Sequence, residues 1–236
     1  YAMEYLDGID LDRLVRAHGP QPPARVVHVL RQVCGALEEA HDLGLIHRDV
    51  KPANVILCRR GRLFDVAKVV DFGLVKELQA DEPVELTGAN TIAGTPLYLS
   101  PEAITDSDTV GPQSDLYALG AVGYFLLTGR PLFEGTLIEV CGHHLHTTPP
   151  PPSERLGRAL PRQLEAVILQ CLEKDPKRRP QGAGELAAAL AACDDVEEWT
   201  QRRAAAWWRE HGAGAARSPV STDEGALTRT MAVSLD

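Results

Sequence analysis

The stretch that decides the fold is His47-Arg48-Asp49-Val50-Lys51-Pro52-Ala53-Asn54, together with a second motif, Asp71-Phe72-Gly73. The first stretch places an acid, an amine and an amide within six residues, and it is too polar to be core. The second motif adds another acid directly after an apolar run. A short hairpin between the motifs would bring two carboxylates and an amide together. The sequence therefore predicts a site for metal binding and proton transfer.

The residues between the two motifs predict that hairpin. Residues 55–58 are an apolar run typical of a buried strand, residues 66–70 are its expected partner, and residues 59–62 are a basic turn. Such a hairpin presents Asn54 and Asp71 at the same end.

The rest of the chain is dominated by helical periodicity. Asp10 is placed to cap the first helix, and Ser114-Asp115 opens an apolar helix expected at the domain centre. Residues 74–99 predict a mobile loop, and the prolines at 149–152 predict an extended connector. The remaining helices are expected at about 11–18, 22–41, 136–145, 161–172 and 182–192.

Composition bounds the class of protein. The chain has 236 residues, 44% of them hydrophobic, and a net charge of -9, which disfavours nucleic acid as a partner of the whole surface. No run reaches the roughly 20 apolar residues of a membrane span. The five cysteines are scattered without a C-x-x-C pair, which favours a reducing, cytoplasmic location. Metal binding at His143, His144 and His146 is disfavoured because no neighbouring ligand completes a set.

These motifs resemble the C-terminal lobe of a bacterial-type serine/threonine protein kinase, over residues 1–193. The resemblance implies an α+β, mainly α-helical fold, a kinase-like C-lobe with a short catalytic β-hairpin. It also implies transfer of the ATP γ-phosphate to serine or threonine hydroxyls of protein substrates, with ATP and Mg²⁺ as cofactors.

The resemblance assigns the chemistry to four residues. Asp49 would accept or orient the proton of the attacking hydroxyl, and Lys51 would reach the transferred phosphate. Lysine at this position is similar to the serine/threonine branch of the family. Asn54 would bind one magnesium ion, and Asp71 the ion that bridges the phosphates.

The opening segment resembles the hinge that binds adenine. Met3 would be the gatekeeper, and Glu4 and Leu6 would offer backbone groups to the base. Asp10 would lie near the ribose, and Ile56 below the adenine ring. A plain apolar strand is the alternative reading of these residues.

Further matches imply regulation and packing. Thr95 lies in the segment resembling the end of an activation loop, Glu102 would pair with Arg179, and Asp115 would brace the turn at His47. His47 and Phe72 would stack in the regulatory spine. Arg48 would receive a phosphate on the activation loop with help from Lys76, and Thr87 and Thr91 are the candidate acceptors.

The family's glycine-rich loop, strand lysine and partner glutamate are not found in these residues. We therefore expect a fragment that begins at the hinge and is inactive alone. A pseudokinase or scaffold is the rival of another class, disfavoured because Asp49, Asn54 and Asp71 are all present. A small-molecule phosphotransferase is a further alternative, disfavoured by the segment 94–102 and its Arg179 match.

The end of the chain changes composition. Residues 194–211 predict an amphipathic helix with three tryptophans, which either packs on the lobe or docks a partner or lipid surface. Packing on the lobe is favoured. Residues 212–236 are rich in Gly, Ala, Ser and Thr and are expected to be disordered.

Overall fold

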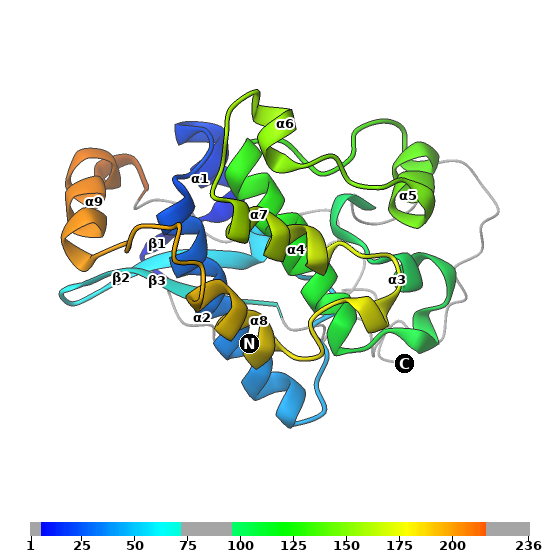
Figure 1. Cartoon of the computed structure of the whole chain (residues 1–236). Helices are drawn as coiled ribbons and strands as arrows, with labels where there is room; N and C mark the ends of the chain where they lie inside the picture. The colour runs from blue at the N-terminus through cyan, green and yellow to red at the C-terminus, as the bar shows by residue number, and fades with distance from the viewer. Residues whose placement is uncertain (1–5, 72–95, 216–236) are drawn as a thin grey trace, which may run out of the picture.

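The structure, a computed structural model, describes residues 6–71 and 96–215 (Figure 1). Its first part contains a small sheet and two helices. Their bounds are Gly8–Asp10 for β1, Leu11–His18 for α1, Pro23–Asp42 for α2, Val55–Arg60 for β2 and Leu63–Val69 for β3.

In the second part of the described chain, residues 96–215, the regular elements are all helices. Its elements are α3 (Pro101–Thr105), α4 (Pro112–Thr128), α5 (Leu137–His146), α6 (Pro152–Leu156), α7 (Arg162–Cys171), α8 (Ala183–Ala191) and α9 (Gln201–Ala215). Figure 1 shows α4 in the middle of the lobe, α3 and α5 at one end, and α9 with the tip of the β2–β3 hairpin at the other.

The three strands form an antiparallel sheet in the order β1-β2-β3. Asp10 pairs with Ile56 across β1 and β2, and Val55 pairs with Val69 across β2 and β3. Beyond the last pair, the Val70 N–H donates to the Asn54 carbonyl at 2.9 Å. The hairpin therefore brings the residues next to Asp71 to the same end as Asn54, as the sequence predicts.

The core is organised around α4, whose residues from Ser114 to Thr128 are all buried. A helix buried on every side belongs at the centre of its domain. Glycine at position 120 allows close packing, because a Cβ there would lie 2.5 Å from the Cβ of Cys171 in α7. Helix α2 packs on α4 from another side and places Val26, Leu30 and Val33 in the same core.

Several sequence predictions need correction. The basic segment 59–62 is not all turn, because β2 runs to Arg60 and β3 begins at Leu63. The prolines at 149–152 do not all form a connector, since Pro152 is the first residue of α6, a position that tolerates proline. The last helix begins at Gln201 and continues to Ala215, so the disorder expected from 212 is wrong for 212–215.

The predicted fold class, mainly α-helical with a small antiparallel sheet, is confirmed. Within the described residues, no helix is long and apolar enough to cross a membrane. In the same residues, no group of three or more His, Cys, Asp or Glu side chains is arranged to hold a metal ion.

Candidate active site

The loop between α2 and β2 brings Asp49, Lys51 and Asn54 into direct contact. The Lys51 ammonium lies 2.7 Å from Asp49 Oδ2, and Asn54 Nδ2 donates to the same oxygen at 3.1 Å. Asn54 Nδ2 also donates to the Asp49 backbone carbonyl at 2.9 Å. Both side-chain donors approach Oδ2, so Oδ1 is the oxygen that an incoming hydroxyl can reach. The loop holds a carboxylate in one orientation with an ammonium beside it.

A buried carboxylate from α4 fixes the backbone of this loop. Asp115 accepts hydrogen bonds from the N–H of His47 and of Arg48, both at 2.9 Å. His41, at the end of α2, contacts Asp115 Oδ2 through Nε2 at 2.8 Å. The bracing of the loop by Asp115 was predicted, whereas no sequence signal pointed to His41. The imidazole of His47 reaches the Val70 carbonyl at 3.1 Å, which joins the loop to the end of the hairpin.

Two residues of the site adopt left-handed backbone conformations. Arg48 has φ 65° and Asp71 has φ 59°. Such values are uncommon outside glycine, although Asp tolerates them better than most residues. The hydrogen bond from the Arg48 N–H to Asp115 helps to hold this conformation, and Arg48 is an exposed residue that lines the cleft described below.

The donor atoms fit a hard cation such as Mg²⁺, which prefers carboxylate and amide oxygens. Asn54 gives its amide protons to Asp49, which leaves its oxygen Oδ1 as the atom available to a cation. Asp71 is exposed just beyond β3, and the hydrogen bond from Val70 to Asn54 keeps the two segments adjacent. Asn54 and Asp71 thus place two oxygen donors at one end of the hairpin, the positions predicted to bind a metal ion.

Of the residues predicted to bind the nucleotide, the structure describes Leu6, Asp10 and Ile56. Asp10 and Ile56 are cross-strand partners, so they lie at the same place in the sheet. The Asp10 carboxylate caps α1 by accepting from Arg13 N–H at 2.8 Å. Burial raises the pKa of Asp10, opposed by that hydrogen bond. Leu6 is half-buried at the start of the described chain.

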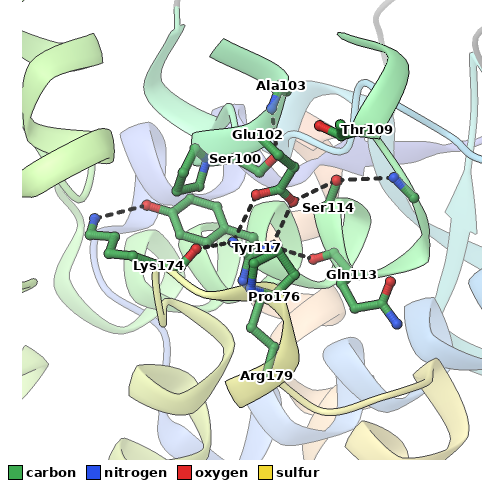
Figure 2. A network of polar contacts seen from close by, with 12 residues as sticks. Ser100, Glu102, Ala103, Thr109, Gln113, Ser114, Tyr117, Lys174, Pro176 and Arg179 are labelled. Atoms are coloured by element: carbon green, nitrogen blue, oxygen red, sulfur yellow. Dashed lines mark hydrogen bonds and ion pairs between the residues drawn. The ribbon is translucent and has the colours of Figure 1, made fainter. Parts of the chain in front are cut away.

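The predicted pair of Glu102 and Arg179 forms, and it is the centre of a polar network (Figure 2). Arg179 donates to both carboxylate oxygens of Glu102, at 2.7 and 2.9 Å, and stacks over the Tyr117 ring at 4.8 Å. Ser114 donates to Glu102 at 2.6 Å. Burial raises the pKa of Glu102, but the hydrogen bonds from Arg179 and Ser114 outweigh it and leave the pKa below its ordinary value.

The remaining Arg179 donors bind backbone carbonyls. They reach Glu173, Gln113 and Lys174 at 2.7, 2.9 and 3.1 Å. All five N–H groups of the guanidinium are thereby used, although the side chain is fully buried. This arginine joins α3, α4 and the turn after α7, and so anchors the segment that faces the catalytic loop.

A cleft lies between the loop at residues 48–51 and the segment at residues 98–103. Asp49 and Lys51 line one side, and Tyr98, Ser100 and Ala103 line the other. The Ser100 side chain caps α3 by accepting from the Ala103 N–H at 3.3 Å. The candidate base therefore lines a small hollow together with the residues that precede and begin α3.

Some predicted residues lie outside the described residues. These are Met3, Glu4, Phe72, Lys76, Thr87, Thr91 and Thr95. Their assignments stay predictions.

Two of the three histidines near the end of α5, His143 and His144, contact hydroxyl groups of the protein. His144 Nδ1 lies 2.8 Å from the Tyr117 hydroxyl, and His143 Nδ1 lies 2.9 Å from the Thr147 hydroxyl. Burial lowers the pKa of His144 to about 4. The Lys174 ammonium also reaches Tyr117, at 3.4 Å, and burial lowers its pKa to about 8. These contacts tie α5 to α4 and the later turn, and the sequence alone gave no signal for Lys174.

The fold and the loop 47–54 are similar to the larger lobe of protein kinases. Residues 1–191 match the protein-family model described as Protein kinase domain. The chain belongs to the protein kinase family.

Curated relatives are bacterial serine/threonine-protein kinases. PknB of Mycolicibacterium smegmatis is 41% identical over 189 residues, which cover 80% of this chain and 29% of the relative. The kinase pkn3 of Myxococcus xanthus is 40% identical over 196 residues, which cover 82% of this chain and 36% of the relative. The chain thus spans about a third of the length of the curated relatives it matches.

Solved kinase structures share the fold. The PknI kinase domain of Mycobacterium tuberculosis superposes with a TM-score of 0.60 at 28% identity, covering 81% of this chain and 64% of that one. Rad53 in complex with AMP-PNP gives a TM-score of 0.59 at 25% identity, covering 78% of this chain and 44% of that one.

Proposed function

We propose that this chain carries the catalytic loop and the metal-binding side of an ATP-dependent protein serine/threonine kinase. The observation that carries the proposal is the Asp49 carboxylate, which is held at one oxygen by Lys51 and Asn54 and faces the cleft. Membership of the protein kinase family and the likeness to PknB support it.

Asp49 would act on the substrate hydroxyl. Its Oδ2 is occupied by two donors, so Oδ1 accepts the hydroxyl proton and aims the oxygen at the phosphorus. Phosphoryl transfer depends on positioning more than on covalent chemistry of the protein. The bracing of the loop by Asp115 therefore contributes to the rate without contact to substrate.

Lys51 and the two oxygen ligands would handle the phosphate charge. Lys51 is about one-third exposed and close to the base, so it can reach the transferred phosphate while still paired with Asp49. Asn54 and Asp71 would hold Mg²⁺. An ion bound by these two residues would supply positive charge against the phosphate oxygens.

The nucleotide would lie along β1 and β2. Ile56 would form the apolar floor and Asp10 would approach the ribose, with Leu6, Met3 and Glu4 on the hinge side. The half-buried Asp10 carboxylate, raised in pKa by desolvation, is compatible with a donor from a sugar hydroxyl.

Regulation would use Arg48. Arg48 is exposed, directly precedes the candidate base Asp49, and has its backbone held by Asp115, so its guanidinium is suited to bind a phosphate group. A phosphate on Thr87 or Thr91, helped by Lys76, would order the loop that faces the substrate.

The partners we propose are ATP and proteins with serine or threonine hydroxyls, not nucleic acid. The net charge of -9 opposes polyphosphate binding by the whole surface. The five cysteines are free thiols, which supports a cytoplasmic location where ATP is supplied.

One experiment separates the kinase from a pseudokinase or scaffold. The complete gene product containing these residues is assayed for phosphate transfer to a generic protein substrate, wild type against Asp49→Asn. We expect phosphoserine or phosphothreonine from the wild type, and a rate roughly 10²- to 10⁴-fold lower in the variant. Equal rates, or no transfer by either protein, would contradict the proposal. Transfer to small molecules but not to proteins would favour a small-molecule phosphotransferase.

A further inference from the structure

A buried carboxylate outside the catalytic cleft collects four hydrogen bonds. Asp65 in β3 is fully buried and accepts from Arg25 Nε and Nη2, at 2.8 and 2.7 Å. It also accepts from the indole N–H groups of Trp199 and Trp208, at 2.8 and 2.7 Å. Both oxygens are therefore shared between an arginine of α2 and a tryptophan of the C-terminal segment. Neither partner alone satisfies the carboxylate.

Aromatic contacts continue this arrangement along α9. The Arg25 guanidinium lies over the Trp207 ring, 3.9 Å from its centroid. The His211 ring stacks on the Trp207 ring, with 5.0 Å between the ring centroids, and His18 at the end of α1 meets both rings edge-on. Cation–π contacts with a desolvated arginine are among the stronger ones.

Gln201, at the start of α9, also pairs with the backbone of the edge strand β3. Gln201 accepts from the Phe64 N–H at 2.9 Å and donates to the Phe64 carbonyl at 3.1 Å. One side chain thus replaces a neighbouring strand at the exposed edge of β3. The segment 199–211 is matched to its surface by hydrogen-bonding pattern as well as by shape.

The rest of the lobe has its own core without α9. The matched family region ends at residue 191. Trp208 is the one residue of α9 that belongs to the core cluster among the described residues, with Trp207 packed against it. Figure 1 shows α9 at the edge of the lobe, joined to α8 by an extended connection. An element with few apolar contacts opens at lower free energy than the core.

We propose that the face formed by α1, α2 and β3 is a docking site for a tryptophan-bearing segment. The site is filled by the chain's own residues 199–211, which include most of α9 and leave the site before the lobe unfolds. The site recognises this segment through the Asp65 carboxylate, which accepts from the indole N–H groups of Trp199 and Trp208. This proposal does not depend on the proposed kinase activity. It makes α9 a latch on β3, the strand that ends at Val69 just before the candidate metal ligand Asp71.

The chain carries its own reporter for this latch. All three of its tryptophans, Trp199, Trp207 and Trp208, lie in the docked segment, so tryptophan emission follows docking alone. Urea is titrated against the whole chain, and emission is compared with far-ultraviolet circular dichroism of the lobe. We expect emission to shift to longer wavelength at a lower urea concentration than the loss of helical signal. Coincident transitions would overturn the proposal, because α9 would then be an inseparable part of the lobe.

Asp65→Asn tests the recognition. Asp65 has φ 53°, a conformation that asparagine also tolerates, so the backbone is not strained by the change. The amide replaces an acceptor oxygen with a group that cannot accept. We expect the emission transition to move to lower urea by more than the circular dichroism transition, which also moves because Arg25 loses part of its buried partner. Trypsin cleavage after the exposed Arg202 should become roughly ten- to a hundredfold faster.

Two further variants complete the test. Asp12→Asn removes a carboxylate from an exposed pair with Arg16 and should change neither transition. Trp208→Phe keeps an aromatic ring but lacks the indole donor, and it gives the same comparison should Asp65→Asn fail to fold. An emission transition unmoved in a folded Asp65→Asn or in Trp208→Phe would overturn the role of Asp65.

Discussion

Replacing Arg179 by lysine keeps the positive charge and removes the planar fork of donors. Arg179 is fully buried and makes five hydrogen bonds, two to Glu102 and three to backbone carbonyls. A lysine ammonium has three donors, so at least two acceptors lose their partner. The substitution therefore tests whether the fork, rather than the charge, holds this region.

The magnitude follows from the lost bonds. A buried acceptor without a partner costs about 1–3 kcal/mol, so two of them cost about 2–4 kcal/mol with partial relaxation. For a domain of this size, each kcal/mol lowers the melting temperature by roughly 2–4 °C. We expect Arg179→Lys to melt roughly 5–15 °C below the wild type.

The assay is thermal unfolding followed by circular dichroism, with urea unfolding to give the free energy. The matched control is the neighbouring residue: Arg178 is two-thirds exposed and makes one ion pair, with Glu173 at 3.1 Å. Arg178→Lys should lie within about 0.5 kcal/mol of the wild type. Equal stability of the two variants would refute the reasoning about the buried fork.

Three further predictions concern packing, pH and regulation. Gly120→Ala should lower the free energy of unfolding by about 1–3 kcal/mol, since its Cβ would lie 2.5 Å from Cys171 Cβ. In the control Gly35→Ala in α2, the new Cβ meets nothing within 4 Å, and the free energy of unfolding should rise by about 0.5–1 kcal/mol. Urea titration measures both changes. Folding lowers the pKa of Glu102 from its ordinary 4.5, so its stabilising contribution is present above that value and is lost as pH falls through the lowered pKa. In Glu102→Gln, the free energy of unfolding should therefore fall less steeply with decreasing pH than in the wild type. An unchanged dependence on pH would contradict this. In the complete gene product, Thr87→Ala/Thr91→Ala should reduce phosphotransfer, and full activity, or active protein with both threonines unmodified by mass spectrometry, would refute loop phosphorylation.

The part of the fold set by local pattern could be predicted from the sequence. The stretch 47–54 and the apolar runs after it specify a loop and hairpin, because strand spacing alone brings Asn54 near Val70. The ends of strands and helices were less predictable. Arg59 and Arg60 look like turn residues, yet they occupy β2 with exposed side chains, and Pro152 starts α6 from within a proline run.

The polar contacts likewise divide into those that the sequence predicts and those that depend on the tertiary fold. The contacts among Asp49, Lys51 and Asn54 lie within six residues, and family spacing indicates them. The hub at Asp65 could not be predicted, because its partners are 40, 134 and 143 positions away and only the tertiary fold brings them together. An Asp after Leu63-Phe64 in a strand carries no local sign of burial.

The measurement that tests the central claim most directly separates the base from the metal ligand. In the complete gene product, the turnover rate and the Mg²⁺-dependent affinity for ATP are measured for Asp49→Asn and Asp71→Asn. We predict that Asp49→Asn lowers turnover and leaves nucleotide affinity near that of the wild type, whereas Asp71→Asn weakens nucleotide binding in the presence of Mg²⁺ and has little effect without it. Unchanged turnover in Asp49→Asn, or Mg²⁺-dependent binding unaffected in Asp71→Asn, would contradict the account.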